Sequence, residues 1–372
     1  MRSNLRILPF DKRPLIDLPR DAYDGVLGTL GYELRSRELP LRLSAATLKC
    51  APAFQDQHVG SYIENRDALG EAGYDIAVVA DENFLALVES LIDECRHLAR
   101  DRLPRIAVDI SSMSRWRIAA VVEALTSDRR GSPLVADLLY APAVRDAPAQ
   151  ADTPILSVEP VSPFLAGWWD DLDQPLAAII GVGSEVEHAS SAIDRLEPED
   201  TYVFVPHGDD ENYRDEVQSA NQGLLAATRD IEQVADYRVT EAYQTFQAID
   251  TLVRRLRTQH RVAVVPLGPK IFAACGALVC SLHYPSAQCI RVSAGERREP
   301  INSRANGTVC GLRLVTGAVD DSSVYTTERV IPGRLGAADG LSDPRGANFR
   351  DPEASNLASD SISQPTARGS RS

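Results

Sequence analysis

The 372-residue sequence lacks features that mark several common classes of protein. No apolar run approaches the roughly 20 residues of a membrane-spanning helix, and residues 1–20 contain no apolar core of the kind found in signal peptides. There is no excess of positive charge. The net charge of −14 argues against a protein that coats nucleic acid or an anionic membrane, since both need a positive face. These absences predict a cytoplasmic protein.

Short motifs for metals and nucleotides are also missing. The six cysteines form no CxxC pair and the six histidines no HExxH motif, which argues against a zinc site. Several cysteines fall in apolar runs, so we expect small buried side chains in a reducing compartment. No Walker-type GxxxxGK[ST] motif is present. Gly181-Val182-Gly183 is a lone GxG, which is weak evidence for NAD(P) or FAD, and the cofactor stays unknown.

One stretch, from Arg261 to Gly295, predicts the centre of the fold. An apolar run at Val262–Val265 ends in the turn Pro266–Lys270, and an apolar helical segment and a second strand-like run follow. This order is typical of a βαβ unit. The first strand lacks polar alternation, which indicates a central parallel strand covered on both faces. In such sheets ligands bind beyond the carboxyl ends of the strands.

The same order of elements occurs twice, at residues 21–141 and 175–297. Arg105–Val108 corresponds to Arg261–Val264, and the turn after each strand leads into a helix. We interpret the repeat as an internal duplication with a period of roughly 150 residues. The expected fold class is therefore α/β, with two tandem Rossmann-like units and mainly parallel sheets.

Three segments lie outside the two expected units. Residues 1–20 are polar and interrupted by proline, which predicts an N-terminal arm. Residues 142–174 are rich in Pro, Ala and Asp, which predicts a linker; its pair Trp168-Trp169 suits packing on a domain face or stacking on a ligand. Residues 298–372 are expected to be a disordered tail, with Cys310–Thr316 at most one stray strand.

The turn before the second apolar helix is the strongest candidate for a binding site. Two prolines and Gly268 restrict its backbone, and Lys270 stands where the helix begins. A helix N-terminus, free N–H groups and a lysine together favour an anion. The alternative is that Lys270 is a solvated lysine of the first helical turn.

The corresponding turn of the first unit contains hydroxyls and a cation, in Ser111, Ser112 and Arg115. One interpretation is that Ser111 or Ser112 is simply the N-cap of the next helix. The other is that the hydroxyls and Arg115 bind an anion at the positive end of that helix. A nucleophilic serine is disfavoured, because no GxSxG elbow is present.

In each unit, one glutamate follows the first strand. Gly31 precedes Glu33, and Gly183 and Ser184 precede Glu185; glycines allow a ligand to approach closely. Glu33 and Glu185 are thus candidates for binding ribose hydroxyls or for acid/base catalysis, against a simple capping or salt-bridging role.

A weak metal candidate is the acidic pair that follows the second strand of the second unit. Asp209 and Asp210 are carboxylates that could hold Mg²⁺. Asp209 as the N-cap of the next helix is the simpler interpretation.

The segment from Pro266 to Gly295, with Gly183-Ser184-Glu185 upstream, is similar to an uncharacterised bacterial family with this duplicated layout. The architecture also resembles, more distantly, the CARF and SAVED nucleotide sensors of bacterial antiviral systems. That resemblance implies nucleotide binding at strand ends; it covers architecture only and carries over no motif residues.

Three hypotheses of function follow. The first is a sensor or adaptor that takes an anionic, nucleotide-like ligand at the strand ends, in a bacterial defence system. The second is an enzyme acting on a nucleotide or sugar phosphate, with Glu33 or Glu185 as acid/base and Lys270 holding phosphate. The third is a structural subunit that binds a protein partner. Clefts filled by their own side chains would favour the third.

Overall fold

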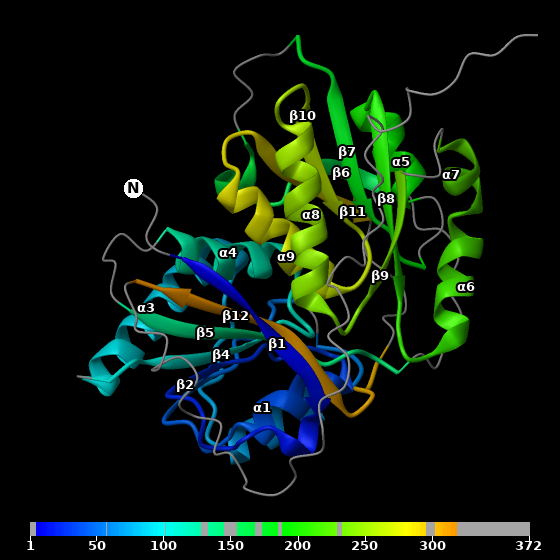
Figure 1. Ribbon diagram of the computed structural model, residues 1–372. Helices are drawn as coiled ribbons and strands as arrows, with labels where there is room; N and C mark the ends of the chain where they lie inside the picture. The colour runs from blue at the N-terminus through cyan, green and yellow to red at the C-terminus, as the bar shows by residue number, and fades with distance from the viewer. Residues whose placement is uncertain are drawn as a thin grey trace, which may run out of the picture. The chain divides into compact units, whose positions relative to one another are not determined.

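Two six-stranded sheets form the framework of the protein (Figure 1). The computed structural model describes residues 5–317, except for residues 57, 101, 128–132, 145–154, 168–172, 185–187, 229–232 and 295–301. Within the described part of the chain the class is mixed α/β, and most strand pairs are parallel. The expected fold class is confirmed.

The first sheet combines a parallel core with two antiparallel strands. In order across the sheet, its strands are β1 (Arg6–Pro14), β12 (Thr308–Thr316), β5 (Leu134–Tyr140), β4 (Arg105–Asp109), β2 (Gly25–Leu27) and β3 (Leu48–Cys50). β12 pairs antiparallel with both β1 and β5. Parallel bridges from Cys50 to Asp75 and from Ala53 to Val78 place a further extended segment beside β3.

The second sheet has the same kind of core. In order across the sheet, its strands are β6 (Ile155–Pro160), β11 (Ala287–Ala294), β10 (Arg261–Pro266), β7 (Leu176–Gly181), β8 (Asp200–His207) and β9 (Val234–Arg238). Only the pair of β6 with β11 is antiparallel among these described strands.

The two parallel cores share one strand order. Numbered from the first core strand of each unit, and counting the segment at Asp75–Val78 as the third, both cores read 3-2-1-4-5. This is the Rossmann order, in which the order of the parallel strands reverses between the first and fourth strands. The reversal lies between β2 and β4 in the first sheet and between β7 and β10 in the second. The shared order agrees with an internal duplication, whose common origin stays a prediction.

Nine helices are described, four in the first unit and five in the second. They are α1 (Glu38–Arg42), α2 (Tyr62–Glu71), α3 (Asp81–Ala99), α4 (Arg115–Thr126), α5 (His188–Leu196), α6 (Glu211–Ala220), α7 (Gln222–Ala227), α8 (Ala242–Leu256) and α9 (Lys270–Leu282). α6 and α7 are two separate helices, because the chain turns at Asn221.

One continuous helix layer joins the two units. α3 packs on α4, α4 on α9 and α9 on α8, and α8 also contacts β1 and β12 of the first sheet (Figure 1). The two inner helices, α4 and α9, are apolar on nearly every side, as expected for helices buried all round. The β-branched run Val262–Val265 is fully buried beneath this layer.

The prediction that residues after 298 form no packed structure is wrong for β12. Val309, Cys310, Leu312, Leu314 and Val315 are buried, and the strand lies between β1 and β5. Arg313 breaks the apolar pattern in the sequence, but it pairs with the buried Asp137 of β5. Residues 318–372 lie outside the described part of the chain.

The expected arm and linker also contain strands. β1 belongs to residues 1–20 and β6 to residues 142–174, and each is the outermost strand of its sheet. Pro9 and Pro14 made β1 look irregular, yet an outermost strand tolerates proline because one of its edges has no partner strand. Trp168 and Trp169 lie outside the described residues.

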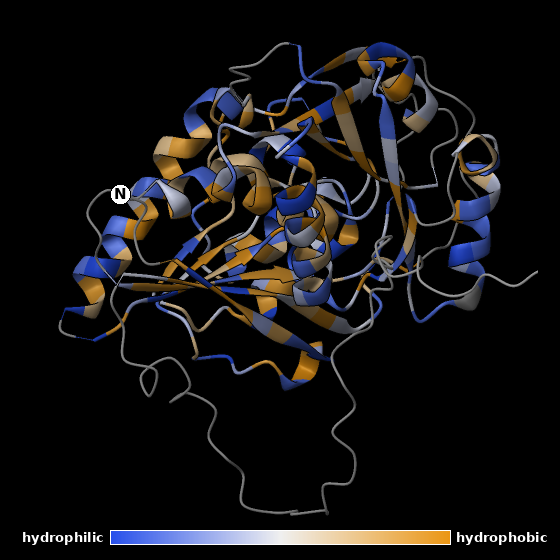
Figure 2. Ribbon diagram, turned by 45° about the horizontal axis from the view of Figure 1, so that its top comes forward, coloured by the Kyte–Doolittle hydropathy of each residue, from blue (hydrophilic) through white to orange (hydrophobic). Residues whose placement is uncertain are grey.

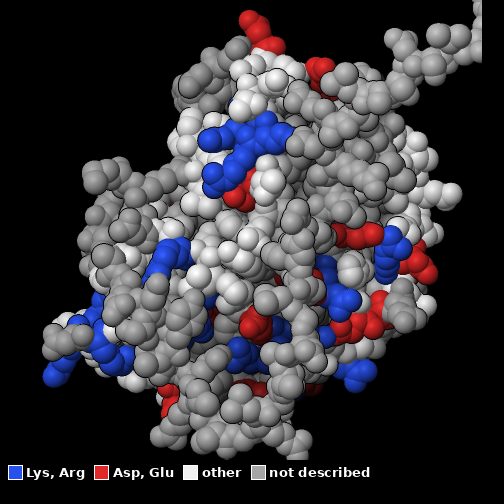
Figure 3. Space-filling model, in the orientation of Figure 1, with Lys and Arg blue, Asp and Glu red and all other residues white. Residues whose placement is uncertain are grey.

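Hydropathy follows this layering. Apolar colour concentrates on the strands and inner helices, whereas polar colour marks the outward helix faces (Figure 2). On the face drawn in Figure 3, basic side chains gather in small groups with acidic side chains beside them.

All six cysteines are free and buried, as expected. None of the helices in the described part is long and apolar enough to cross a membrane.

Candidate functional site

The candidate site lies where α4 of the first unit and α9 of the second unit begin. The guanidinium of Arg115 donates to the carbonyl oxygens of Pro266 and Leu267, and to that of Gly268 at 3.3 Å. Near the other ends of these helices, Ser281 Oγ donates to Thr126 Oγ1 at 2.8 Å. Neighbouring helices that meet at both their starts and their ends run parallel. The two equivalent turns, which follow β4 and β10, therefore meet at one place.

Both helices begin with a basic residue. Arg115 is the first residue of α4, and Lys270 is the first residue of α9 and half-buried. A cation at a helix N-terminus is unfavourable, because the N-terminus already carries a positive partial charge. Two parallel helices side by side add their positive ends. The region thus concentrates positive potential, and an anion there would be stabilised.

Gly268 serves the packing of its own turn. A Cβ at this position would lie 2.2 Å from the carbonyl oxygen of Val182. The N–H groups of Leu267 and Gly268 both donate to the carbonyl oxygen of Gly181, at 2.8 and 2.9 Å. The glycine lets the turn after β10 approach the end of β7.

In the first unit, Glu33 bridges the loops that follow β2 and β4. Its Oε2 accepts from Arg35 Nε at 2.7 Å and from Ser112 Oγ at 3.2 Å. The Glu33 side chain is 18% exposed. Gly31 lies beside Ser112, since a Cβ built at Gly31 would lie 3.8 Å from that of Ser112, an ordinary van der Waals contact. The structure therefore brings Gly31, Glu33 and Ser112 together.

Asn65 of α2 holds the loop after β2 in place, and the sequence analysis missed it. Its amide nitrogen donates to the carbonyl oxygens of Gly31 and Glu33, at 3.0 and 2.8 Å, and to Ser36 Oγ at 2.9 Å. Its Oδ1 is buried and has no hydrogen-bond partner within the described structure. The signal in the sequence was a polar residue on the helix face that contains the buried Tyr62 and Leu69.

Ser111 is part of a buried network, so it is not an N-cap. Its Oγ donates to Asp109 Oδ1 at 2.5 Å and accepts from the N–H of Ala141 at 2.9 Å. Ser114 is the residue that caps α4, accepting from the N–H of Arg117. Burial raises the pKa of Asp109 from 3.8 to about 6, although the hydrogen bonds from Ser111 oppose the shift. Asp109 was part of an expected strand, but its charge was overlooked.

The sequence analysis also missed Arg117, whose side chain lies where β3 and the segment at Asp75–Val78 of the first sheet end. The side chain is fully buried, and its nitrogens donate to the carbonyl oxygens of Pro52, Ala53 and Val79 at 2.8–3.0 Å. Its guanidinium lies over the rings of Phe54 and Phe84. Arg117 thus ties the loops that follow the second and third core strands to α4.

The second unit is described less completely at the equivalent point. The carbonyl oxygen of Gly183 accepts from Asn221 Nδ2 at 2.8 Å, and Ser184 is half-buried. Glu185, the second acid/base candidate, lies outside the described residues. Its proposed equivalence to Glu33 stays a prediction.

The two weak metal candidates have other partners. Lys12 Nζ donates to Asp209 Oδ2 at 2.5 Å, which joins β1 to the loop after β8. Asp210, and not Asp209, caps α6, accepting from the N–H of Asn212 at 3.0 Å. Within the described part of the chain, no group of three His, Cys, Asp or Glu residues could hold a metal ion.

No protein-family model matches the sequence, and no curated protein matches it either. Its chemistry therefore has to be inferred from the geometry of the site.

Proposed function

We propose that this protein is a sensor or adaptor that binds an anionic, nucleotide-like ligand where α4 and α9 begin. The observation that carries the proposal is the parallel pairing of these helices, each of which starts with a basic residue. The helix ends themselves disfavour a cation at either position, whereas both helix ends attract an anion. A phosphate bound there would compensate both.

The strand order supports the same place. In Rossmann-type sheets ligands occupy the crevice beside the strand-order reversal, outside the carboxyl ends of the strands. Glu33 and Ser112 flank that crevice in the first unit, and Lys270 follows the equivalent strand in the second. Phosphate would lie at the helix starts, and Glu33 would accept hydrogen bonds from ribose hydroxyls. The proposal includes a role of this protein in bacterial defence, which the resemblance of its layout to the CARF and SAVED sensors implies.

The enzyme hypothesis receives less support. It needs a proton-transfer group that a substrate can reach. The carboxyl group with a raised pKa in this cluster is that of Asp109, which is 3% exposed and bonded to Ser111. A substrate cannot touch it, so Glu33 is left as the candidate in the described part of the chain.

A structural subunit is the second candidate, and specific contacts favour it. Ser112 and Glu33 bridge the crevice of the first unit, and Gly268 lets the turn after β10 approach the end of β7 in the second. If these contacts closed both crevices, the protein would act through its outer surface on a protein partner.

Native mass spectrometry of the protein purified from its host tests the proposal. We expect a phosphate-containing small molecule to remain bound to the wild type and to Lys12→Ala, and to be lost from Lys270→Ala. Lys12 is a suitable control because it is exposed and lies outside these turns. A small molecule that Lys270→Ala retains equally would place the ligand elsewhere. A protein partner in place of any small molecule would favour the structural subunit.

A further inference from the structure

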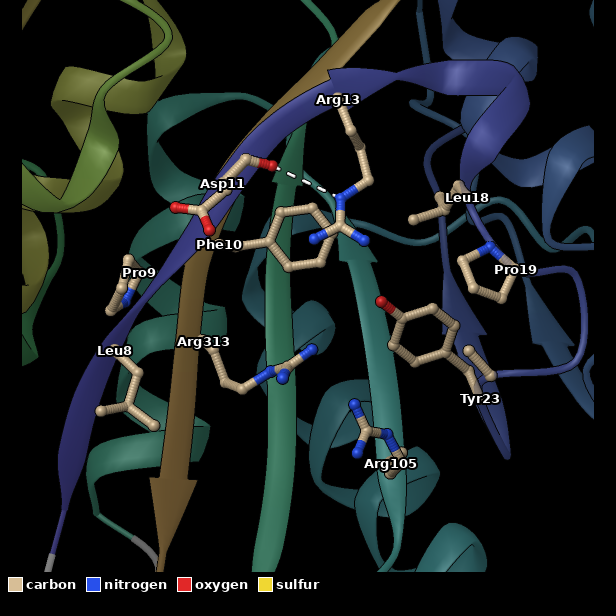
Figure 4. A pocket seen from close by; sticks show the side chains of 11 residues that line it. Leu8, Pro9, Phe10, Asp11, Arg13, Leu18, Pro19, Tyr23, Arg105 and Arg313 are labelled. Atoms are coloured by element: carbon tan, nitrogen blue, oxygen red, sulfur yellow. Dashed lines mark hydrogen bonds between the residues drawn. The ribbon is translucent and has the colours of Figure 1, made fainter. Parts of the chain in front are cut away.

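A second cationic site lies on the other face of the first sheet, away from the candidate site. It is a pocket with a volume of about 170 Å³, bounded by β1, the segment from Leu18 to Tyr23, and the start of β4. Three arginines line it, namely Arg13, Arg105 and Arg313, and we call it the arginine pocket (Figure 4). Arg105 opens β4, whereas the candidate site lies beyond the end of that strand.

The strand register explains why charges gather here. Arg313 of β12 lies directly opposite Asp137 of β5, and Asp137 lies opposite Ala107 of β4. Side chains two residues apart on a strand share a face, so Arg105 projects from the same face as Ala107. A polar stripe therefore crosses three adjacent strands on a surface that would otherwise be apolar.

The one fully buried acid in this stripe is already satisfied. Arg313 donates to both oxygens of Asp137, from Nε at 2.7 Å and from Nη2 at 2.9 Å. The hydroxyl of Tyr23 donates to the same carboxylate at 2.7 Å. Asp137 thus accepts three hydrogen bonds and has little capacity left for Arg105.

At least one nitrogen of Arg105 lacks such a partner in the described part of the chain. Its Nε is buried and makes no hydrogen bond in the described structure. Figure 4 shows its guanidinium directed towards the space between Tyr23 and Arg313. Burial lowers the pKa of Arg105, which means that its surroundings do not fully replace the water it has lost. Asp11 is the acid among the residues that line the pocket, and its carboxylate points away from Arg105 in Figure 4.

We propose that the arginine pocket binds the oxyanion of a small molecule, with Arg105 as the principal ligand and Arg13 on the opposite wall. Phosphate and carboxylate share this chemistry, because guanidinium groups bind both through paired N–H donors. Apolar walls formed by Phe10, Leu18 and Pro19 would contact the rest of the molecule. The site does not depend on the function proposed for α4 and α9.

Titration calorimetry with inorganic phosphate and with succinate, at constant ionic strength, tests this inference. We expect saturable binding of at least one of the two, and the stronger one identifies the source of the oxyanion. Arg105→Gln should weaken binding by about 10- to 100-fold, the usual loss when a charge-assisted hydrogen bond is removed. Arg20→Gln is the matched control, because Arg20 is exposed next to Pro19 but does not line the pocket.

Further variants keep the result decisive. Arg13→Gln, at a half-buried position on β1, should also weaken binding and replaces Arg105→Gln if that variant fails to fold. Lys270→Ala should leave this binding unchanged, which separates the arginine pocket from the candidate site. Equal affinities of the wild type and the Arg105 and Arg13 variants, or no binding of either anion by the wild type, would overturn the inference.

Discussion

Arg117 is a charged side chain that is fully buried beside the edge of the first sheet. Its charge lies in the core, yet three carbonyl oxygens and Asp81 surround the guanidinium, and two aromatic rings cover it. Such a residue organises the loops around it, because the loop after β3 gives two acceptors, Pro52 and Ala53, and the loop after the third core strand gives one, Val79. Removing the guanidinium would leave those acceptors buried and unpaired.

We therefore predict that Arg117→Met destabilises the protein by about 3–5 kcal/mol, the usual effect of removing one partner from a buried charged network. Urea unfolding measures the change. Arg66→Met is the control, since Arg66 is exposed and pairs with the adjacent, exposed Asp67, and it should change stability by less than about 0.5 kcal/mol. A loss below about 1 kcal/mol for Arg117→Met would show that water replaces the guanidinium.

Asp109 should make stability depend on pH. Its folded pKa of about 6 is above its ordinary value of 3.8, so its contribution is fully present below pH 4 and is lost as the pH rises through 6. Asp109→Asn keeps an oxygen that accepts from Ser111 but cannot ionise. Between pH 4.5 and 7 the stability of the wild type relative to this variant should fall by about 2 kcal/mol.

Urea unfolding of both proteins at the two pH values gives this difference, and pH effects of other groups cancel. A constant difference between wild type and Asp109→Asn would mean that Asp109 is ionised throughout this range.

At the scale of elements, buried parallel strands were predictable and peripheral strands were not. The run Val262–Val265 is short, rich in valine and without polar alternation, a pattern typical of a strand covered on both faces. β1 and β6 carry prolines and polar residues that an outermost strand tolerates, so local composition resembled an arm and a linker. β12 pairs with strands that lie more than 150 residues earlier, and no local pattern reports such pairing.

The position of β12 gives a direct test at this scale. A chain that ends at Gly317 keeps β12, whereas one that ends at Gly307 loses it. Loss of β12 would expose the edges of β1 and β5 and remove five buried apolar side chains. We predict cooperative thermal unfolding for the longer chain and none for the shorter one, followed by circular dichroism. Similar melting curves for the two chains would contradict the pairing of β12 with β5.

The candidate site was predicted in part for the same reason. Strand ends and helix starts are readable in sequence, so the positions of Lys270, Glu33 and Ser112 were predictable, whereas their role in binding stays a prediction. Asn65 and Asp109 act through partners from other elements, and those partners cannot be identified without the fold. The hydrogen bonds from Arg115 to the turn at Pro266–Gly268 depend on how the two units pack, which the sequence does not indicate.

At the scale of the whole molecule, the two units share one helix layer and bring their equivalent turns together. The contact is made by Arg115 of the first unit and the carbonyl oxygens that precede α9. A ligand at this place would touch both units at once. The same geometry would let binding change how the units pack, which is what a sensor requires.

Isothermal titration with nucleoside mono-, di- and triphosphates, run beside thermal melts, tests the central proposal most directly. Lys270→Ala should weaken binding by about 10- to 100-fold, because one charge-assisted hydrogen bond to phosphate is lost. Its stability should hardly change, since a cation at a helix N-terminus is not stabilising. Lys12→Ala should bind like the wild type. Equal affinities of wild type and Lys270→Ala, or no binding of any nucleotide, would contradict an anion site at the start of α4 and α9.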